Sequence, residues 1–239
     1  MQQTDPFGIA IKDYYQARFR WGKKLVMRSS LSGIEKTPVS YYFRSFRKMP
    51  LLERQALDLC EGSVLDVGAC AGSHALLLQN RGFDVTALDI SKACCEVMLS
   101  RGIKSVVCSD INNYKSRKFN TILLLMNGIG MAGTLKELPH FLNHLKNLLL
   151  PGGQILFDSC DIDYAYYEPD GSKWVDLNNA YYGQVKYTPV FKHSEGQDFN
   201  WLFVDSNKMK AVARLCGFNF TILAEGSQSA YLGKLIIQG

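Results

Sequence analysis

The sequence predicts an α/β fold in which a mostly parallel sheet is covered by helices on both faces. Residues 63–91 have the pattern strand, tight turn, helix, strand, which is the size of one βαβ unit. Residues 119–126, FNTILLLM, form a nearly continuous apolar run, which is typical of a strand covered on both faces. The chain has 239 residues, of which 47% are hydrophobic, enough for one sizeable core.

The turn inside residues 63–91 predicts a ligand site. An apolar strand ends on Asp66, and the small residues at positions 68–72, GACAG, precede an apolar helix. Small residues let the backbone approach a ligand closely, and the first N–H groups of the helix point into that space. The next strand ends on Asp89, whose carboxylate can accept hydrogen bonds from two ribose hydroxyls. The unit therefore predicts binding of a nucleoside-containing cofactor.

This turn resembles motif I of the class I S-adenosylmethionine (SAM)-dependent methyltransferases, an acid followed by x-G-x-G-x-G. Asp66, Gly68 and Gly72 match the motif, and Cys70 stands where the middle glycine is usual. The turn spacing disfavours a nicotinamide oxidoreductase, whose fingerprint is G-x-G-x-x-G. The resemblance implies a Rossmann-like, seven-stranded sheet and an enzyme of the small-molecule type that converts SAM to S-adenosyl-L-homocysteine.

The resemblance also implies roles for individual residues. Asp66 would orient the turn and the methionyl amino group, Asp89 would hold the ribose, and Asp110 would bind the adenine amino group, with a turn or capping role as the alternative for Asp110. Asn127 is expected to contact cofactor or substrate, or to be a simple turn residue. The full set expected at the cofactor is Asp66, Gly68, Ala69, Cys70, Gly72, Asp89, Ile90, Asp110, Ile111 and Asn127.

The N-terminal residues 1–61 are expected to form a mainly helical cap, with a loop over 31–38 and a helix after Pro50. The remaining residues, 62–239, form the predicted methyltransferase domain. Residues 1–60 hold 11 Lys/Arg and 5 Asp/Glu, a net charge of +6, whereas the rest holds 16 and 17. This basic segment fits a solvated helical face, or a surface for an anionic substrate or for RNA.

The middle of the chain continues the alternation of helices and strands. Ser91 is a candidate cap for a helix to Arg101, and a strand follows over 105–111. Thr134 and Glu137 have capping-box spacing before a helix that ends near residue 149, and a strand over 154–159 follows the L-x-P-G-G pattern. His140 and His144, four residues apart, are a weak zinc pair without a third ligand, so no metal is predicted.

Residues 160–203 are too long for an ordinary connection and rich in aromatics, so we expect an inserted antiparallel hairpin with strands over 184–191 and 199–204. Its rings are expected to line a substrate pocket, or else to form a small satellite core or a dimer contact. The candidate substrate contacts are Tyr14, Trp21, Asp158 and Trp174. His74, His193, Asp158 and several tyrosines are candidate bases, with a cofactor-side or capping role as the alternative for His74, and no catalytic residue is singled out.

A helix over 206–216 and strands over 218–224 and 231–238 close the predicted fold. No apolar stretch approaches the roughly 20 residues of a membrane span, and the start lacks a signal-peptide pattern, so a cytoplasmic protein is expected. The expected acceptor is a small molecule, with anionic ones among the candidates. An RNA or protein acceptor and a non-catalytic SAM-binding protein are the alternatives, and the absence of an N-P-P-Y motif at Asn127 weighs against nucleic-acid bases. The oligomeric state stays open.

Overall fold

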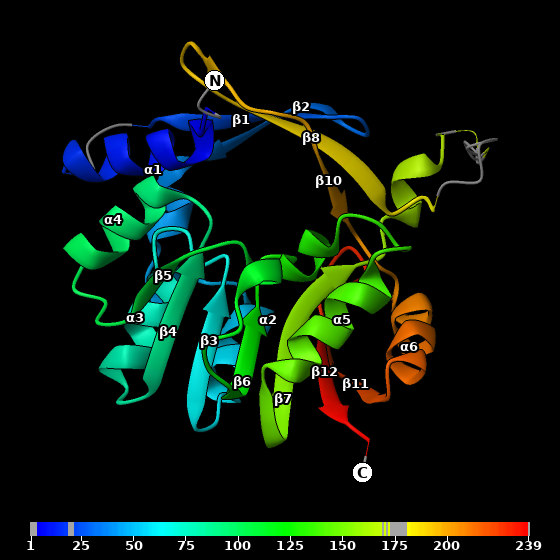
Figure 1. The fold of residues 1–239 in the computed structure, drawn as a ribbon. Coiled ribbons are helices and arrows are strands. Elements are labelled where there is room, and N and C mark those ends of the chain that lie inside the picture. The colour runs from blue at the N-terminus through cyan, green and yellow to red at the C-terminus, as the bar shows by residue number, and fades with distance from the viewer. Residues whose placement is uncertain (1–3, 19–21, 169, 171, 173–180, 239) are drawn as a thin grey trace.

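The fold was analysed in a computed structural model that describes residues 4–18, 22–168, 170, 172 and 181–238. Its centre is a seven-stranded sheet in the order β11-β12-β7-β6-β3-β4-β5 (Figure 1). The strands are β3 (Ser63–Val67), β4 (Asp84–Asp89), β5 (Val106–Cys108), β6 (Phe119–Leu124), β7 (Leu149–Cys160), β11 (Phe218–Glu225) and β12 (Ala230–Ile237). Strands β3 to β7 pair in parallel, and β12 pairs antiparallel with β7 and β11. The predicted Rossmann-like sheet is confirmed.

Helices cover both faces of this sheet. The helices are α2 (Leu51–Asp58), α3 (Ser73–Asn80), α4 (Lys92–Ser100), α5 (Leu138–Asn147) and α6 (Ser206–Leu215). The apolar side chains of α5 and α6 share one core with Phe119 and Phe157. Those of α2, α3 and α4 share a second core with Val64 and Leu156. Since β6 and β7 supply residues to both cores, their apolar runs over 122–124 and 155–157 follow from burial on two faces.

The helix ends follow the local signals with one shift. Ser91 caps α4 by accepting a hydrogen bond from Cys94 N (3.1 Å), as predicted, and Asp205 caps α6 through Lys208 N (2.9 Å). Thr134 Oγ1 accepts from Glu137 N (3.2 Å), but α5 begins only at Leu138. The predicted capping box therefore closes the turn that precedes the helix, not the helix itself.

A second, antiparallel sheet joins segments that lie far apart in the chain, in the order β10-β8-β1-β2, with β9 paired to β8. Its strands are β1 (Lys24–Ser29), β2 (Gly33–Pro38), β8 (Gln184–Phe191), β9 (Ser194–Glu195) and β10 (Phe199–Leu202). The predicted hairpin of β8 and β10 is confirmed. The loop predicted over 31–38 is wrong, because residues 33–38 form β2. Its glycine and proline are tolerated there because β2 is an edge strand.

This second sheet, here called the covering sheet, lies across the carboxyl edge of the central sheet (Figure 1). Helix α1 (Pro6–Gln16) packs beside it, capped by Asp5 through Gly8 N (2.7 Å). A third core holds the layer in place, with Ile11, Leu25 and Phe191 packed against Ala71 and Val97 of the central domain. The N-terminal segment and the insertion thus form one layer above the site rather than two separate covers.

The segment before residue 62 has two structural parts. Its helices α1 and α2 agree with the predicted helical cap, but β1 and β2 are strands that the sequence did not predict. Short 3-10 turns, η1 (Val39–Phe43) and η2 (Phe46–Lys48), connect β2 to α2. Helix α2 lies before residue 62 but packs in a core of the central sheet. The domain boundary placed after residue 61 therefore stays a prediction.

Candidate active site

The turn after β3 has the backbone that a close ligand contact requires. Gly68 and Gly72 have φ of +69° and +76°, in the left-handed region. A Cβ at Gly72 would lie 2.2 Å from Ile103 Cδ1, so only glycine fits there. Cys70 adopts the same region with φ of +54°, which explains why glycine is usual at this position in motif I. The turn therefore keeps its shape despite the cysteine.

Two buried carboxylates hold this turn. Asp66 Oδ2 accepts from Ala75 N (3.1 Å) in the first turn of α3, and burial raises the pKa of Asp66. Asp89 Oδ2 accepts from Cys70 N (2.7 Å), and Asp89 Oδ1 accepts from Ser91 N (2.8 Å). Burial raises the pKa of Asp89 to about 6, although these two N–H groups lower it. Because each carboxylate oxygen can accept a second hydrogen bond, Asp89 can still bind a pair of hydroxyls.

The tips of β4 and β5 offer one exposed and one buried apolar side chain. Ile90, next to Asp89, is 71% exposed, so it offers an aliphatic surface to a flat ligand. Asp110 Oδ1 caps the short turn η3 (Ile111–Asn113) through Asn112 N (2.9 Å) and Nδ2 (3.1 Å). Ile111 is only 5% exposed, in the core. Asp110 thus has the capping role that was the alternative, and its contact with adenine stays a prediction.

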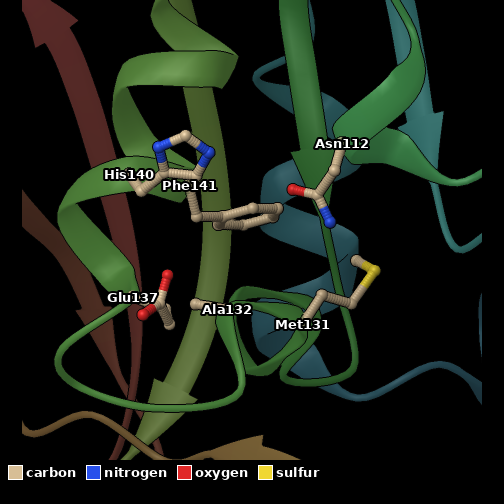
Figure 2. A pocket seen from close by; sticks show the side chains of 6 residues that line it. All are labelled: Asn112, Met131, Ala132, Glu137, His140 and Phe141. Carbon is tan, nitrogen blue, oxygen red and sulfur yellow. The ribbon is translucent and has the colours of Figure 1, made fainter.

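A pocket of about 180 Å³ opens beside these residues, between η3, α5 and the turn η4 (Gly128–Ala132). Figure 2 shows its lining: Asn112, Met131, Ala132, Glu137, His140 and Phe141. The Met131 side chain connects the pocket to the motif I turn, because its Cε lies 3.5 Å from an ideal Cβ on Gly68. Sequence reasoning missed Met131 and Asn112, although Asn112 follows the predicted adenine contacts directly.

The tips of β6 and β7 are joined by a hydrogen bond between two predicted site residues. Asn127 N donates to Asp158 Oδ2 (3.0 Å), and Asn127 Nδ2 donates to Leu202 O of β10 (3.1 Å). Met126 and Asn127 both have left-handed backbones, with φ of +60° and +56°. Two successive non-glycine residues in this region are strained, and such strain clusters at functional sites.

A buried ionic cluster lies near Asp158. Glu53 of α2 accepts hydrogen bonds from Arg44 Nη2 and from His74 Nε2 (2.9 Å). Burial alone would raise the pKa of Glu53, but His74 and Arg44 together lower it. Burial raises the pKa of Asp158 to about 6, while Asn127 N and His74 oppose that rise. Arg44 and Glu53 were missed because the cluster joins positions without a local motif.

The comparisons with known proteins agree with this geometry. The family profile of a methyltransferase domain matches residues 41–207. A SAM-dependent methyltransferase from Bacteroides fragilis, solved in complex with S-adenosyl-L-homocysteine, is 38% identical, with a TM-score of 0.91 over 98% of this chain and 95% of that chain.

The chain belongs to the class I SAM-dependent methyltransferases. Two more distant structures show the same fold and no more than the fold. The CcbJ methyltransferase from Streptomyces caelestis is 11% identical, with a TM-score of 0.63 and 98% of each chain covered. An amino pentose methyltransferase from Micromonospora echinaspora, solved with SAM bound, is 15% identical, with a TM-score of 0.53 over 80% of this chain and 93% of that chain. No curated protein matches the chain.

The methyltransferase places the predicted substrate residues in different environments. Asp158 lies at the carboxyl edge, whereas Tyr14 is buried in the third core with its ring centroid 5.2 Å from that of Phe43. A substrate contact by Tyr14 stays a prediction. Trp21 and Trp174 lie outside the described residues.

The aromatic residues of the insertion divide between two sites. Tyr181 Oη donates to Asp205 Oδ2 (2.7 Å) and Tyr182 Oη donates to Asp161 Oδ1 (2.7 Å). Tyr181 also packs against the core that holds α5 and α6, and a separate satellite core stays a prediction. Trp201 of β10 packs on η4, since a Cβ on Gly130 would lie 2.4 Å from Trp201 Nε1. Trp201 thus brings the covering sheet down onto the tip of β6.

His140 and His144, the weak zinc pair of the sequence, have different contacts in the structure. His144 Nε2 donates to Ile111 O (2.7 Å), and His140 lines the pocket of Figure 2. Within the described ranges, no group of three His, Cys, Asp or Glu side chains could hold a metal ion. Likewise, no described helix has both the length and the apolar composition needed to cross a bilayer.

Proposed function

We propose that this methyltransferase uses SAM to methylate a small-molecule acceptor by in-line displacement. The observation that carries the proposal is the motif I turn, in which Asp89 accepts a hydrogen bond from Cys70 N, and Gly72 has a left-handed backbone packed closely against Ile103. The S-adenosyl-L-homocysteine complex of the 38% identical relative supports the same cofactor.

The residues present fit this cofactor. Asp89 would hold the ribose hydroxyls with its free acceptor positions, and Ile90 would pack on the adenine. Gly68, Ala69, Cys70 and Gly72 would line the methionyl and ribose side, with Asp66 fixing the start of α3 below them. Asp110 and Ile111 would bound the adenine, next to the pocket of Figure 2.

The protein's part in the reaction is to position the acceptor and to exclude water. SAM, when bound, supplies a methyl group on a sulfonium that needs no further activation. The covering sheet lies over the carboxyl tips of the central strands, so we expect proximity and desolvation to supply most of the rate (Figure 1). A layer over the strand tips favours a small acceptor over a folded RNA or protein.

The charges of the N-terminal segment also support a small acceptor. Several of its basic side chains are occupied by carboxylates rather than left free for a polyanion. These ion pairs are Lys12–Glu96, Lys23–Asp13, Arg28–Glu195 and Arg44–Glu53. An RNA acceptor would instead need these cations for phosphates and would give strongly salt-dependent binding. The cytoplasmic location expected from the sequence belongs to the same proposal.

The test is calorimetric titration with SAM, S-adenosyl-L-homocysteine and NAD. We expect binding of the SAM series alone and a loss of at least about tenfold in affinity in Asp89→Ala, since two ribose hydrogen bonds would go. Asp84→Ala is the matched control, because Asp84 lies at the opposite end of the same strand, in an exposed ion pair with Arg117. Failure of the wild-type protein to bind the SAM series would refute the proposal. Tight binding without turnover on any acceptor panel would favour the non-catalytic alternative.

A further inference from the structure

The tips of β6 and β7 hold two buried oxygens that lack hydrogen-bond partners. They are Asn127 Oδ1 and Asp158 Oδ1, which belong to residues already joined by the 3.0 Å bond from Asn127 N to Asp158 Oδ2. A buried polar atom without a partner costs about 1–3 kcal/mol, so such atoms at a ligand site call for a ligand that donates to them.

The orientation of both side chains is fixed by their other contacts. Asn127 Nδ2 donates to Leu202 O (3.1 Å), so turning the amide over would set two oxygens against each other. Asp158 uses its Oδ2 for Asn127 N. The oxygens left for a ligand are therefore acceptors, one of them part of a carboxylate.

The charge of Asp158 is not matched by a cation. Among the described residues, no ion pair involves Asp158, whereas the neighbouring Glu53 is paired with both Arg44 and His74. The pKa of Asp158, raised by burial to about 6, leaves the group mostly ionised at neutral pH. A partly buried carboxylate that has no counter-charge, and whose Oδ1 is inaccessible to water, favours a ligand that carries or develops positive charge.

The position in the sheet separates these oxygens from the proposed ribose and adenine contacts. The ribose and adenine contacts follow β4 and β5, the motif I turn follows β3, and Asn127, the remaining expected contact, follows β6, which lies between β3 and β7 in the strand order. Asp158, on β7, is therefore on the side of the motif I turn that faces away from the ribose and adenine residues, and Trp201 of the covering sheet closes over β6 there.

We infer that Asp158 and Asn127 bind the nucleophilic nitrogen of a primary amine, which makes the protein an amine N-methyltransferase. This inference rests on the proposed function. A neutral primary amine has two N–H groups, as many as there are unpartnered oxygens at the two strand tips, and keeps its lone pair free. A hydroxyl or a secondary amine has only one such hydrogen and would leave one buried oxygen unpaired.

An amine that arrives as an ammonium ion first loses one proton to water, and the reaction of the free amine then balances without a further reactant. The nitrogen lone pair forms the new N–C bond while the S–C bond of the sulfonium breaks and its electron pair stays on sulfur. Positive charge thus moves from sulfur to nitrogen, where the Asp158 carboxylate stabilises it. The product ammonium loses its additional proton to water after release.

The experiment measures amine binding to the complex of the protein with S-adenosyl-L-homocysteine, by ligand-observed NMR. D-glucosamine, tyramine and putrescine are compared with their hydroxyl counterparts D-glucose, tyrosol and 1,4-butanediol. We expect an amine to bind at least about tenfold more tightly than its counterpart, and Asp158→Asn to weaken it by roughly tenfold to 100-fold, as for a hydrogen bond to a charged group. Asparagine keeps the acceptor for Asn127 N, so the variant should fold.

Asp161→Asn is the matched control, since it removes a carboxylate just beyond β7 that is bound to Tyr182 and not to Asn127. Asp161→Asn should change neither the affinity for the amine nor the affinity for S-adenosyl-L-homocysteine by more than about twofold. If Asp158→Asn instead weakens S-adenosyl-L-homocysteine binding, the oxygens serve the cofactor's own ammonium and the inference is overturned. The inference is also overturned if no amine binds, or if amines bind the wild-type protein and Asp158→Asn with equal affinity. If the wild-type protein does not bind S-adenosyl-L-homocysteine at all, it is the proposed function that has failed.

Discussion

The two sheets of this methyltransferase show two ways in which a sequence specifies strands. In the central sheet, β3 and β4 are joined by one helix and pair in parallel from Ser63–Asp84 to Val67–Leu88. In the covering sheet, β1 pairs with β8, so residues 26–29 meet residues 187–190. The central strands were recognisable from their own residues, whereas β1 and β2 were not.

The difference lies in what each strand needs from the rest of the chain. The part of a strand that is buried on two faces must be apolar, so residues 122–124 of β6 and 155–157 of β7 carry that signal themselves. Strand β2 is an edge strand with mostly exposed residues, and only its partner β1 defines it. Pairing over a long sequence separation leaves little local pattern and closes late in folding.

The largest expected effect separates the two sheets by their stability. Leu65 of β3 and Leu25 of β1 are both fully buried. Each Leu→Ala change should therefore lower the free energy of unfolding of the sheet that contains it by about 2–5 kcal/mol. Leu65→Ala should lower the free energy of unfolding of the whole protein. Leu25→Ala should increase amide exchange only in α1, β1, β2 and β8.

Hydrogen exchange followed by mass spectrometry measures the protection of the backbone amides in both variants. Uniform loss of protection in Leu25→Ala would mean that the covering sheet and the central sheet unfold together, which would contradict the division drawn between them.

The motif I turn gives the next effect, and it belongs to the central sheet. In Gly72→Ala the new Cβ would meet Ile103 Cδ1 and Met98 Cγ at a φ of +76°, so we expect a loss of about 2–4 kcal/mol. Gly82→Ala is the control, because Gly82 has a φ of +91° and nothing within 4 Å of its Cβ position, and only about 1 kcal/mol should be lost. Urea unfolding measures both. Equal losses would mean that backbone conformation alone explains Gly72.

Asp158, which lies where the two sheets meet, should make stability depend on pH. Its pKa is raised from about 3.8 to about 6, so the folded protein favours the protonated form, and this stabilisation is lost as the pH rises through 6. Asp158→Asn stays neutral, so it should be more stable than wild type by about 1–3 kcal/mol at pH 7.5 and equal to it near pH 4. The titratable groups that face Asp158 are Glu53, His74, Tyr41 and Cys160.

Denaturant unfolding of the two proteins at both pH values checks this expectation, with Asp161→Asn as the control. A pH-independent difference between wild type and Asp158→Asn would show that the carboxyl of Asp158 keeps its ordinary pKa.

The smallest expected effect concerns Cys70. Cys70→Gly restores the usual glycine and relieves the left-handed φ of +54°, while it adds freedom to the unfolded chain. These terms oppose each other, so the free energy of unfolding should change by less than about 1 kcal/mol. Affinity for S-adenosyl-L-homocysteine should change by less than about twofold. Cys70→Val puts a β-branched residue at this φ. It should lose more than about 1 kcal/mol in the free energy of unfolding and more than about twofold in affinity for S-adenosyl-L-homocysteine.

Much of the candidate site could be predicted from the sequence because motif I concentrates its residues. Asp66, Gly68 and Asp89 lie within one βαβ unit, and their strand and turn positions follow from chain order alone. Asn127 and Asp158 were expected at the tips of separate strands, since parallel strands bring their carboxyl ends to one edge. That a hydrogen bond joins them was not in the sequence.

Most of the parts that sequence reasoning missed depend on contacts between distant segments, although β1 and β2 pair locally and were missed because β2 is mostly exposed. Arg44, Glu53 and His74 form their buried cluster from a loop, α2 and α3, and no spacing connects them. Met131 reaches Gly68, and Trp201 covers Gly130, in the same way.

The sequence by itself determined the central sheet, its helices and the motif I turn, because each needs a pattern of apolar or small residues that is local. Tertiary structure alone decided β1 and β2 and their pairing with the predicted hairpin of β8 and β10, the pairing of Asn127 with Asp158 and the charge left on Asp158. The physical reason is that a hydrogen bond or ion pair between distant residues produces no periodic pattern of residue types in the sequence. Its effect appears only when folding removes water from both partners.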